Sequence, residues 1–308
     1  MGKAWRTFSS TVRNGIKLEM VRIGFRLGGV LVPETATRYA ARIFCTPFAS
    51  SRQRALRAPR DGAREATIRI DSRSIQTYLW GDPATQPYVL FAHGWSSHGT
   101  RILPWVAPLR DAGYAVVAFD QAGHGRSGGK FATLPGFTDL LIEIGRRHGP
   151  AAAVIGHSLG AAAATAALVR GLAAERAILL APSADPVAAA LRFAHFVGLP
   201  RHLCRRMIER FERRIGIAFA EFQAHRNAPR IARPALIVHD LDDREVPWAE
   251  GERYARFWAD SRLLSTQGLG HNRIADDAGV IAAAVRFLRG DSVGERVVSS
   301  PNLPYGFA

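Results

Sequence analysis

The sequence contains few cysteines and no long apolar run. Its 308 residues include only two cysteines, Cys45 and Cys204, which lie far apart and have no metal-ligand spacing around them. This excludes a disulfide framework and favours a reducing compartment. No apolar run reaches the roughly 18 residues that a membrane-spanning helix requires. Lys and Arg also interrupt the N-terminal segment where a secretory signal would be continuously apolar. We therefore expect a cytoplasmic protein.

Acidic residues are scarce in two segments of the chain. The sequence has 41 Lys and Arg against 26 Asp and Glu, a formal net charge of +15. Residues 1–64 hold 13 Lys and Arg against 3 Asp and Glu, and residues 185–233 hold 10 against 4. A basic segment can bind phosphate, anionic lipid or an acidic partner. No zinc-finger spacing, aromatic RNA-binding platform or basic-region heptad accompanies these segments, so we expect no nucleic acid partner.

Residues 10–31 carry an apolar stripe with helical spacing. Its members follow one another at steps of three or four, which places them on one face of a helix: Val12, Ile16, Met20, Ile23, Leu27 and Val30. Lys and Arg are interleaved with the stripe, and a second helical pattern covers residues 35–44. We favour helices that pack on the body of the protein, since such stripes usually face a core. The alternative is a basic amphipathic element on an anionic membrane surface. Residues 50–64 predict an exposed linker.

From residue 66, short apolar runs alternate with helical patterns. Two runs, 66–70 and 75–80, predict an antiparallel pair that enters a sheet. Six more strands are expected at 88–92, 115–119, 152–155, 177–180, 235–238 and 262–265. Helical patterns occur at about 102–112, 134–147, 161–172, 249–258 and 278–288. This alternation predicts an α/β protein with a mainly parallel sheet flanked by helices on both faces.

The alternation stops between Pro182 and Pro234. Helices are predicted at 186–197, 200–215 and 217–225, with no strand among them, which indicates an all-helical insertion. We therefore predict a basic helical N-terminal extension and linker over 1–64, and an α/β core over 65–182 and 234–290. The helical cap insertion covers 183–233 and a C-terminal tail covers 291–308. We expect the cap to lie over the active site and to set substrate size.

The segment Gly156-His157-Ser158-Leu159-Gly160 has the G-x-S-x-G pattern of a nucleophile elbow. It follows a short apolar strand and opens an alanine-rich helix, as the motif requires. The turn is tight, so the neighbours of the serine must be small, and Gly156 and Gly160 meet this need. Ser158 would then be exposed at the tip of the strand, where the helix N-terminus favours the negative charge of an oxyanion.

A serine nucleophile needs a base, and the base needs a carboxylate that orients it. Among the ten histidines, His271 follows the last strand and precedes the last helix, at the same sheet edge as the elbow. The carboxylate is expected after the strand at 235–238, in a loop that offers several aspartates. We favour Asp243 over Asp242 on the geometry of this loop, in which Asp243 lies three residues before Val246-Pro247 at the start of the next helix, and on the family resemblance given below.

Two backbone N–H groups are candidates for an oxyanion hole. One belongs to Leu159, directly after the nucleophile, and the other to Trp95 in the turn His93-Gly94-Trp95-Ser96. Gly94 permits a sharp turn there, which would aim the N–H of Trp95 at the substrate carbonyl. Acyl transfer at such a site needs neither a cofactor nor a metal ion.

From about residue 66 to 288 the chain resembles the α/β-hydrolase family, in the branch of serine esterases and lipases with helical caps. The motifs that carry the resemblance occur in the order and spacing of the family: His93-Gly94-Trp95, Asp120-x-x-Gly123-His124-Gly125-x-Ser127, the elbow around Ser158, Asp243-x-x-Val246-Pro247 and Gly270-His271. The resemblance implies the α/β-hydrolase fold, a triad of Ser158, Asp243 and His271, and oxyanion donors at Trp95 and Leu159. The chain departs from the family at His239-Asp240, where His-Gly is usual, and this bears on the choice between Asp242 and Asp243.

We therefore predict a serine hydrolase that cleaves a small acyl ester through an acyl-enzyme on Ser158. The serine excludes the epoxide hydrolases and haloalkane dehalogenases of this fold, which place aspartate at the elbow. Two alternatives stay open. One is a peripheral membrane enzyme that hydrolyses lipids or thioesters, with residues 1–64 on an anionic membrane surface. The other is a non-catalytic ligand-binding protein on a hydrolase fold.

Overall fold

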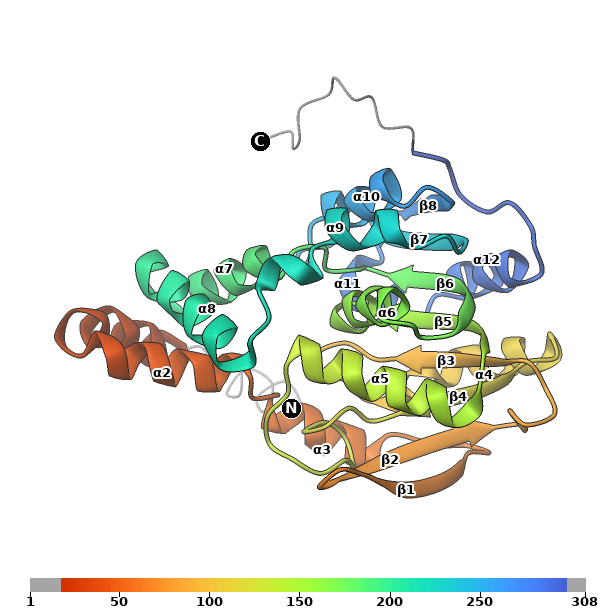
Figure 1. The fold of residues 1–308 in the computed structure, drawn as a ribbon, viewed down its shortest axis with the longest axis horizontal. Coiled ribbons are helices and arrows are strands. Elements are labelled where there is room, and N and C mark those ends of the chain that lie inside the picture. Colours follow the sequence, from red (N-terminus) through yellow and green to blue (C-terminus); the bar gives the residue numbers. More distant parts are fainter. Residues whose placement is uncertain (1–17, 298–308) are drawn as a thin grey trace, which may run out of the picture. The chain divides into compact units, whose positions relative to one another are not determined.

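The computed structural model describes residues 18–297, which divide into two compact units (Figure 1). We call the first the helical unit; it combines residues 18–45 with 186–220. The second, the sheet unit, combines residues 46–185 with 221–297. The divisions thus lie at 45/46, 185/186 and 220/221, whereas the predicted boundaries were 64/65, 182/183 and 233/234. Within the described range, no helix is long and apolar enough to cross a bilayer.

The sheet unit is built on one eight-stranded sheet. Its strands are β1 (Arg64–Ile70), β2 (Arg73–Trp80), β3 (Tyr88–Ala92), β4 (Ala115–Phe119), β5 (Ala151–His157), β6 (Ala174–Leu180), β7 (Ala235–Asp240) and β8 (Ser261–Thr266). Their order across the sheet is β1-β2-β4-β3-β5-β6-β7-β8. β2 pairs antiparallel with both β1 and β4, and all the other pairs are parallel. The predicted α/β fold is confirmed, including the antiparallel pair at its start.

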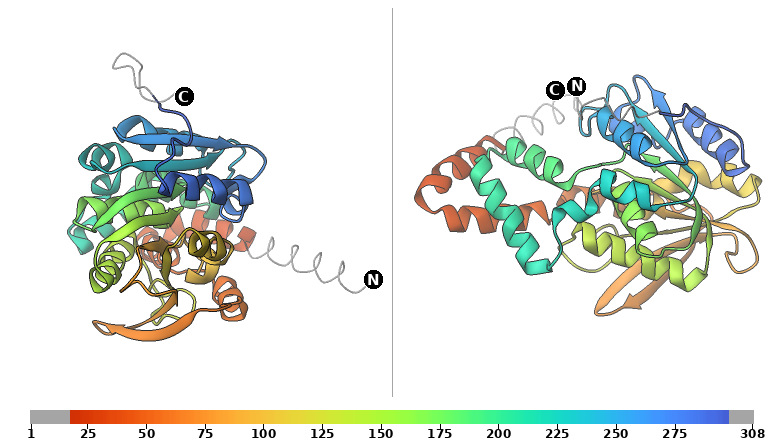
Figure 2. Two further views of the ribbon diagram at one scale, coloured as in Figure 1. Left: turned by 90° about the vertical axis from the view of Figure 1, so that its right-hand side faces the viewer. Right: turned by 45° about the horizontal axis from the view of Figure 1, so that its top comes forward.

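Helices cover both faces of this sheet (Figures 1 and 2). One face packs against α5 (Leu134–His148), α6 (Leu159–Val169) and α10 (Trp248–Phe257), and the other against α4 (Leu103–Asp111) and α12 (Ala278–Leu288). Because side chains alternate along a strand, the neighbours Leu90 and Phe91 enter opposite cores. Strands β3 and β4 are therefore apolar at every position. The carboxyl ends of the parallel strands share one edge, so the loops after β5, β7 and β8 lie at that edge.

The helical unit has an apolar core of its own. It contains a helix over residues 18–31, α2 (Pro33–Phe44), α7 (Pro186–Val197) and α8 (Arg201–Ile215). Its buried residues come from both segments of the chain: Phe25, Ala36, Ala40, Ala190, Ala194, Val197, Leu199, Leu203, Cys204, Met207 and Ile208. Gly29 allows a close approach, because a Cβ there would lie 3.1 Å from a methyl group of Leu203. The N-terminal extension and the insertion, predicted as separate elements, thus share one core.

The helix over residues 18–31 packs with a different face from the one predicted. Of the apolar stripe, Met20, Ile23, Leu27 and Val30 are between 52 and 81% exposed. Packing instead involves Val21, Phe25 and Gly29, at steps of four along the helix. The glycine lets the partner helix approach closely on this face, which is the one that packs. The preference for a packed stripe was therefore wrong for these residues.

Two other predicted segments also differ from the structure. Residues 50–64, predicted as an exposed linker, contain most of helix α3 (Ala49–Arg57), of which Ser51 and Ala55 are buried. Two small residues are too few to produce a visible apolar pattern. The predicted helix at 217–225 is instead the 3₁₀ turn η2 (Phe219–Phe222) and the short α9 (Ala224–Asn227). Gln223 between them is extended and interrupts the helix. In the predicted tail, Glu295 pairs with Leu263 of β8.

Candidate active site

Ser158 occupies the junction between β5 and α6 with a strained backbone. Its φ and ψ are 54° and −118°, a conformation that a non-glycine residue rarely adopts and that holds the side chain at the tip of the turn. The adjacent glycines leave room for this turn. A Cβ on Gly156 would lie 2.5 Å from the Cα of Ala161, and one on Gly160 would lie 2.2 Å from the carbonyl oxygen of Ala92. The local sequence therefore fixes where the hydroxyl is presented.

His271 and Asp243 complete a chain of hydrogen bonds that begins at Ser158. The imidazole Nε2 of His271 lies 2.9 Å from the Ser158 Oγ, and its Nδ1 lies 2.7 Å from the Asp243 Oδ2. His271 is in the short α11 (Gly270–Arg273) after β8, and Asp243 follows β7. The structure thus brings together three side chains that are separated by 28 and 113 positions in the sequence.

Asp243, and not Asp242, is the carboxylate beside His271. The second carboxylate oxygen of Asp243 accepts hydrogen bonds from the backbone N–H groups of Glu245 and Val246, at 2.8 and 2.9 Å. Asp242 is exposed and accepts from the N–H of Gly268 instead. Burial would raise the pKa of Asp243, but hydrogen bonds from His239 and His271 outweigh it and hold that pKa below its ordinary value. The carboxylate is therefore ionised and can stabilise an imidazolium.

His239 is a second histidine on the same carboxylate, which the sequence analysis did not assign. It is fully buried, and its Nε2 lies 3.2 Å from the Asp243 Oδ2 and 3.0 Å from the carbonyl oxygen of Val246. The Nε2–H therefore donates toward both oxygens. Gly251 makes room for the ring, since a Cβ there would lie 2.4 Å from the His239 Nδ1. The only signal in the sequence was the position of this histidine at the end of a strand.

Asp240 connects the loop that carries Asp243 to the loop that carries His271. It is fully buried, and its Oδ1 accepts from the N–H of Asp242 at 3.0 Å. Its Oδ2 accepts from the hydroxyl of Thr266 at 2.7 Å and from the N–H of Leu269 at 3.0 Å. Burial would raise the pKa of Asp240, but these hydrogen bonds lower it overall. The departure from the family pattern at this position therefore supplies a bridge between the two loops.

His157 contacts His271 with its own ring. Its Nε2–H donates to the carbonyl oxygen of His271 at 2.9 Å, and the two rings lie 5.0 Å apart between centroids. Burial lowers the pKa of His157 to about 3, so its ring is neutral near pH 7. A neutral ring avoids placing a second positive charge beside an imidazolium at His271. His157 thus holds the backbone of the segment that carries His271.

The predicted oxyanion donors lie on two segments that meet beside Ser158. Leu159 is the first residue of α6, where a backbone N–H has no acceptor within the helix. Trp95 follows Gly94, and a Cβ on Gly94 would lie 3.1 Å from the Cβ of Ser158. The turn that carries Trp95 is therefore in contact with the nucleophile. The side chains of Trp95 and Leu159 pack against the buried Phe137 and its neighbours.

Two neutral histidines hold the turn that contains Trp95. The Nε2 of His124 accepts from the N–H of Ser96 at 3.1 Å, and the Nε2 of His93 accepts from the N–H of Gln121 at 2.9 Å. Burial lowers the pKa of each to about 3. Both rings can therefore accept a hydrogen bond at neutral pH. Asp120 anchors the same region by accepting from the N–H of Gly99 at 2.7 Å. The turn is thus held in part by Asp120 and His124, which belong to a separate motif of the sequence.

Comparisons with known proteins agree with this fold. A family model described as serine aminopeptidase, S33, matches residues 83–217. Among solved structures, mouse alpha/beta hydrolase domain-containing protein 10 is similar with a TM-score of 0.57 and 20% identity, over 74% of this chain and 98% of that chain. A thioesterase domain from the curacin biosynthetic pathway has a TM-score of 0.56 and 20% identity, over 74% of this chain and 100% of that chain. A Paleococcus ferrophilus monoacylglycerol lipase has a TM-score of 0.54 and 21% identity, over 70% of this chain and 98% of that chain.

The chain therefore has the α/β-hydrolase fold, and the serine hydrolase family model matches part of it, residues 83–217. The described residues, 18–297, contain no group of three or more His, Cys, Asp and Glu side chains that could hold a metal ion.

Proposed function

We propose that this protein is a serine hydrolase that cleaves acyl esters through an acyl-enzyme on Ser158. The observation that carries the proposal is the unbroken chain of hydrogen bonds from the Ser158 hydroxyl through His271 to Asp243, at 2.9 and 2.7 Å. Three groups in this order are the arrangement that activates a serine nucleophile. A binding protein without catalysis has no need of this geometry, or of the strain at Ser158.

In the proposed reaction, His271 Nε2 accepts the proton of Ser158 as the Oγ attacks the ester carbonyl carbon. The oxyanion of the tetrahedral intermediate accepts hydrogen bonds from the N–H groups of Trp95 and Leu159. The imidazolium is stabilised by the ionised Asp243, and its proton passes to the leaving alcohol as the C–O bond breaks. Water then attacks the acyl-enzyme with His271 as base again, and the acid is released as Ser158 recovers its proton.

Ester cleavage is favoured as the reaction, with thioester cleavage as the second candidate. Similar solved structures include a thioesterase domain, a monoacylglycerol lipase and an esterase. Each of these three names denotes an enzyme that cleaves a bond to an acyl group. A thioester would pass through the same acyl-enzyme, with a thiol as the leaving group. A panel of p-nitrophenyl esters and acyl thioesters of graded chain length would define the acyl group and the preferred bond.

The test of the mechanism is the variant Ser158→Ala. It should retain the fold and lose turnover on the order of a thousandfold or more, because only binding and the oxyanion hole would remain. A fluorophosphonate probe should label the native protein at Ser158 and leave the variant unlabelled. Turnover within a few-fold of the native protein would refute the proposal. A native protein that resists labelling would instead support a non-catalytic binding role.

A further inference from the structure

The helical unit leaves an apolar surface uncovered at the turn between its first two helices. Val30, Leu31 and Val32 are consecutive in the chain and are 81, 76 and 52% exposed. The exposed stripe of the preceding helix adjoins them. We call the whole set the apolar corner: Met20, Ile23, Leu27, Val30, Leu31 and Val32. Three consecutive exposed apolar residues are unusual on a surface that meets only water, and a contiguous apolar patch commonly marks an interaction site.

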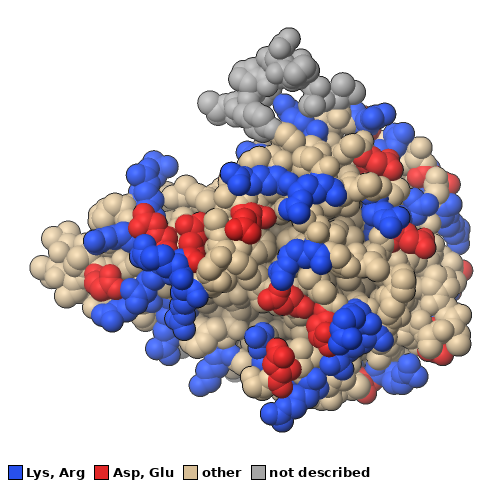
Figure 3. Space-filling view, viewed as in Figure 1, with Lys and Arg blue, Asp and Glu red and all other residues tan. Residues whose placement is uncertain are grey.

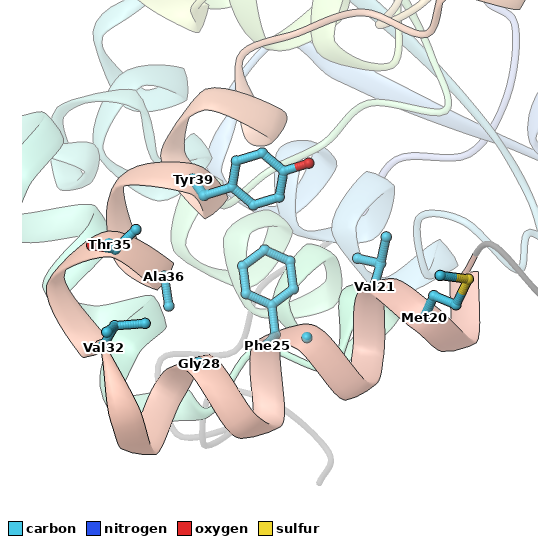
Figure 4. Close-up of a pocket in the computed structure, with 9 residues that line it drawn as sticks. Met20, Val21, Phe25, Gly28, Val32, Thr35, Ala36 and Tyr39 are labelled. Atoms are coloured by element: carbon cyan, nitrogen blue, oxygen red, sulfur yellow. The ribbon is translucent and has the colours of Figure 1, made fainter.

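An open groove continues the apolar corner between the helix over 18–31 and α2 (Figure 4). Its volume is about 380 Å³, and none of its nine lining residues is charged. Met20 and Val32 belong to both the corner and the groove, and the rings of Phe25 and Tyr39 lie between the two helices. The groove and the apolar corner beside it therefore form one continuous apolar surface that a ligand can contact.

The charge of the helical unit is strongly positive. Its described residues, 18–45 and 186–220, include 11 arginines against 4 glutamates. Some of these are paired, such as Arg22 with Glu19 and Arg210 with Glu34. Figure 3 shows Lys and Arg side chains gathered over α2 and α8, next to an end of the unit that carries no charge. Arg26 on the helix over 18–31 and Arg38 on α2 are both exposed.

We propose that the apolar corner and its neighbouring arginines bind the surface of an anionic lipid bilayer. Apolar side chains of a surface helix insert to the boundary of headgroups and acyl chains, while guanidinium groups reach lipid phosphates. A second copy of this chain fits the corner less well, because two surfaces with the same positive excess repel each other. The proposal concerns the helical unit alone and is independent of the chemistry at Ser158.

The test is co-sedimentation of the full chain with lipid vesicles. Vesicles of phosphatidylcholine should leave the protein in solution, whereas vesicles with about one third phosphatidylserine should sediment it, less so at high salt. The combined variant Val30→Ser, Leu31→Ser and Val32→Ser should weaken binding at least tenfold. The double variant Arg26→Gln and Arg38→Gln should weaken it about 25-fold, since each basic residue near an anionic surface contributes about fivefold.

Matched controls come from the sheet unit. Leu56 is 53% exposed in α3, and Arg289 is exposed after α12, so Leu56→Ser and Arg289→Gln change similar groups elsewhere. Both should sediment like the native protein. Ser158→Ala should do so as well, which separates lipid binding from hydrolysis. The variants of the apolar corner and of Arg26 and Arg38 should hydrolyse a short soluble ester at the native rate, and this would show that they remain folded.

Three results would overturn the proposal. The full chain could stay in solution with anionic vesicles, or the apolar-corner variant could bind them as tightly as the native protein. In the third, the native chain would form a dimer without lipid and the apolar-corner variant would not, which would identify a second copy as the occupant. Analytical ultracentrifugation over a range of concentrations detects that dimer.

Discussion

Replacement of Asp240 by alanine should damage both stability and catalysis, because this side chain bridges the loops of Asp243 and His271. Its carboxylate accepts hydrogen bonds from the N–H groups of Asp242 and Leu269 and from the Thr266 hydroxyl. The hydroxyl can rotate to another acceptor, but the two N–H groups cannot. The acceptor that the two N–H groups lose is fully buried, and a donor left without a partner there costs about 1–3 kcal/mol, so Asp240→Ala should lose about 4 kcal/mol of unfolding free energy.

For a chain of this size, a loss of about 4 kcal/mol corresponds to a fall in Tm of roughly 10 °C. The loop that carries His271 would also lose a connection, and a displacement of about 1 Å at a catalytic group can cost about a hundredfold in rate. We therefore expect kcat/KM to fall between ten- and a hundredfold. Differential scanning fluorimetry and ester hydrolysis, measured on the same preparation below the Tm, give the two quantities.

Asp242→Ala is the matched control for this prediction. Asp242 is exposed and adjacent to the same loop, and its side chain accepts from the N–H of Gly268. The Tm of the Asp242→Ala protein should stay within about 2 °C of the native value, and its kcat/KM within about threefold, as is usual for a surface substitution. An Asp240→Ala protein with native kcat/KM would refute a positioning role, even if its Tm fell. Equal losses in the two variants would refute the bridge itself.

Two further predictions concern the buried histidines. His239→Phe should lower kcat about tenfold, because it removes a donor to Asp243. His239→Gln retains a donor and should lower kcat less. Equal kcat values for the two variants in steady-state kinetics would argue against a role for this contact. Stability should be full above about pH 6.5 and fall toward pH 3, because three histidines whose pKa burial lowers to about 3 take up protons on unfolding. Their combined effect reaches at most about 4 kcal/mol per pH unit, and urea denaturation at pH 7.5 and pH 5.5 measures it; equal unfolding free energies would contradict it. The three histidines with a pKa of about 3 are His93, His124 and His157.

The fold and the residues around Ser158 could be predicted because local chemistry dictates both. The central strands β3 and β4 are buried on two faces, so their apolar runs gave the observed bounds. The glycines beside Ser158 are required by backbone contacts within the same turn. Asp243 was preferred over Asp242 from its spacing to Val246, and that spacing reflects the hydrogen bond between the Asp243 carboxylate and the Val246 N–H.

Contacts between segments that are far apart in the sequence could not be predicted from such patterns. The approach of His239 to Asp243 depends on how the loop after β7 folds back, and no periodicity records it. The helix over residues 18–31 offered two candidate faces. The larger apolar face was chosen, whereas the structure packs the one that holds Phe25 and Gly29. Only the partner helix, with Leu203, decides between these faces.

The shared core of the helical unit bears on how this protein can be shortened. Phe25, Ala36 and Ala40 from the beginning of the chain pack with Leu203 and Met207 from a segment more than 150 positions later. Removing the first 45 residues to obtain a smaller fragment would deprive α7 and α8 of these packing partners and expose their buried side chains to water. Such a fragment should aggregate, so truncation is a poor way to learn what residues 18–45 contribute. Substitutions of exposed residues in this segment are the better experiment.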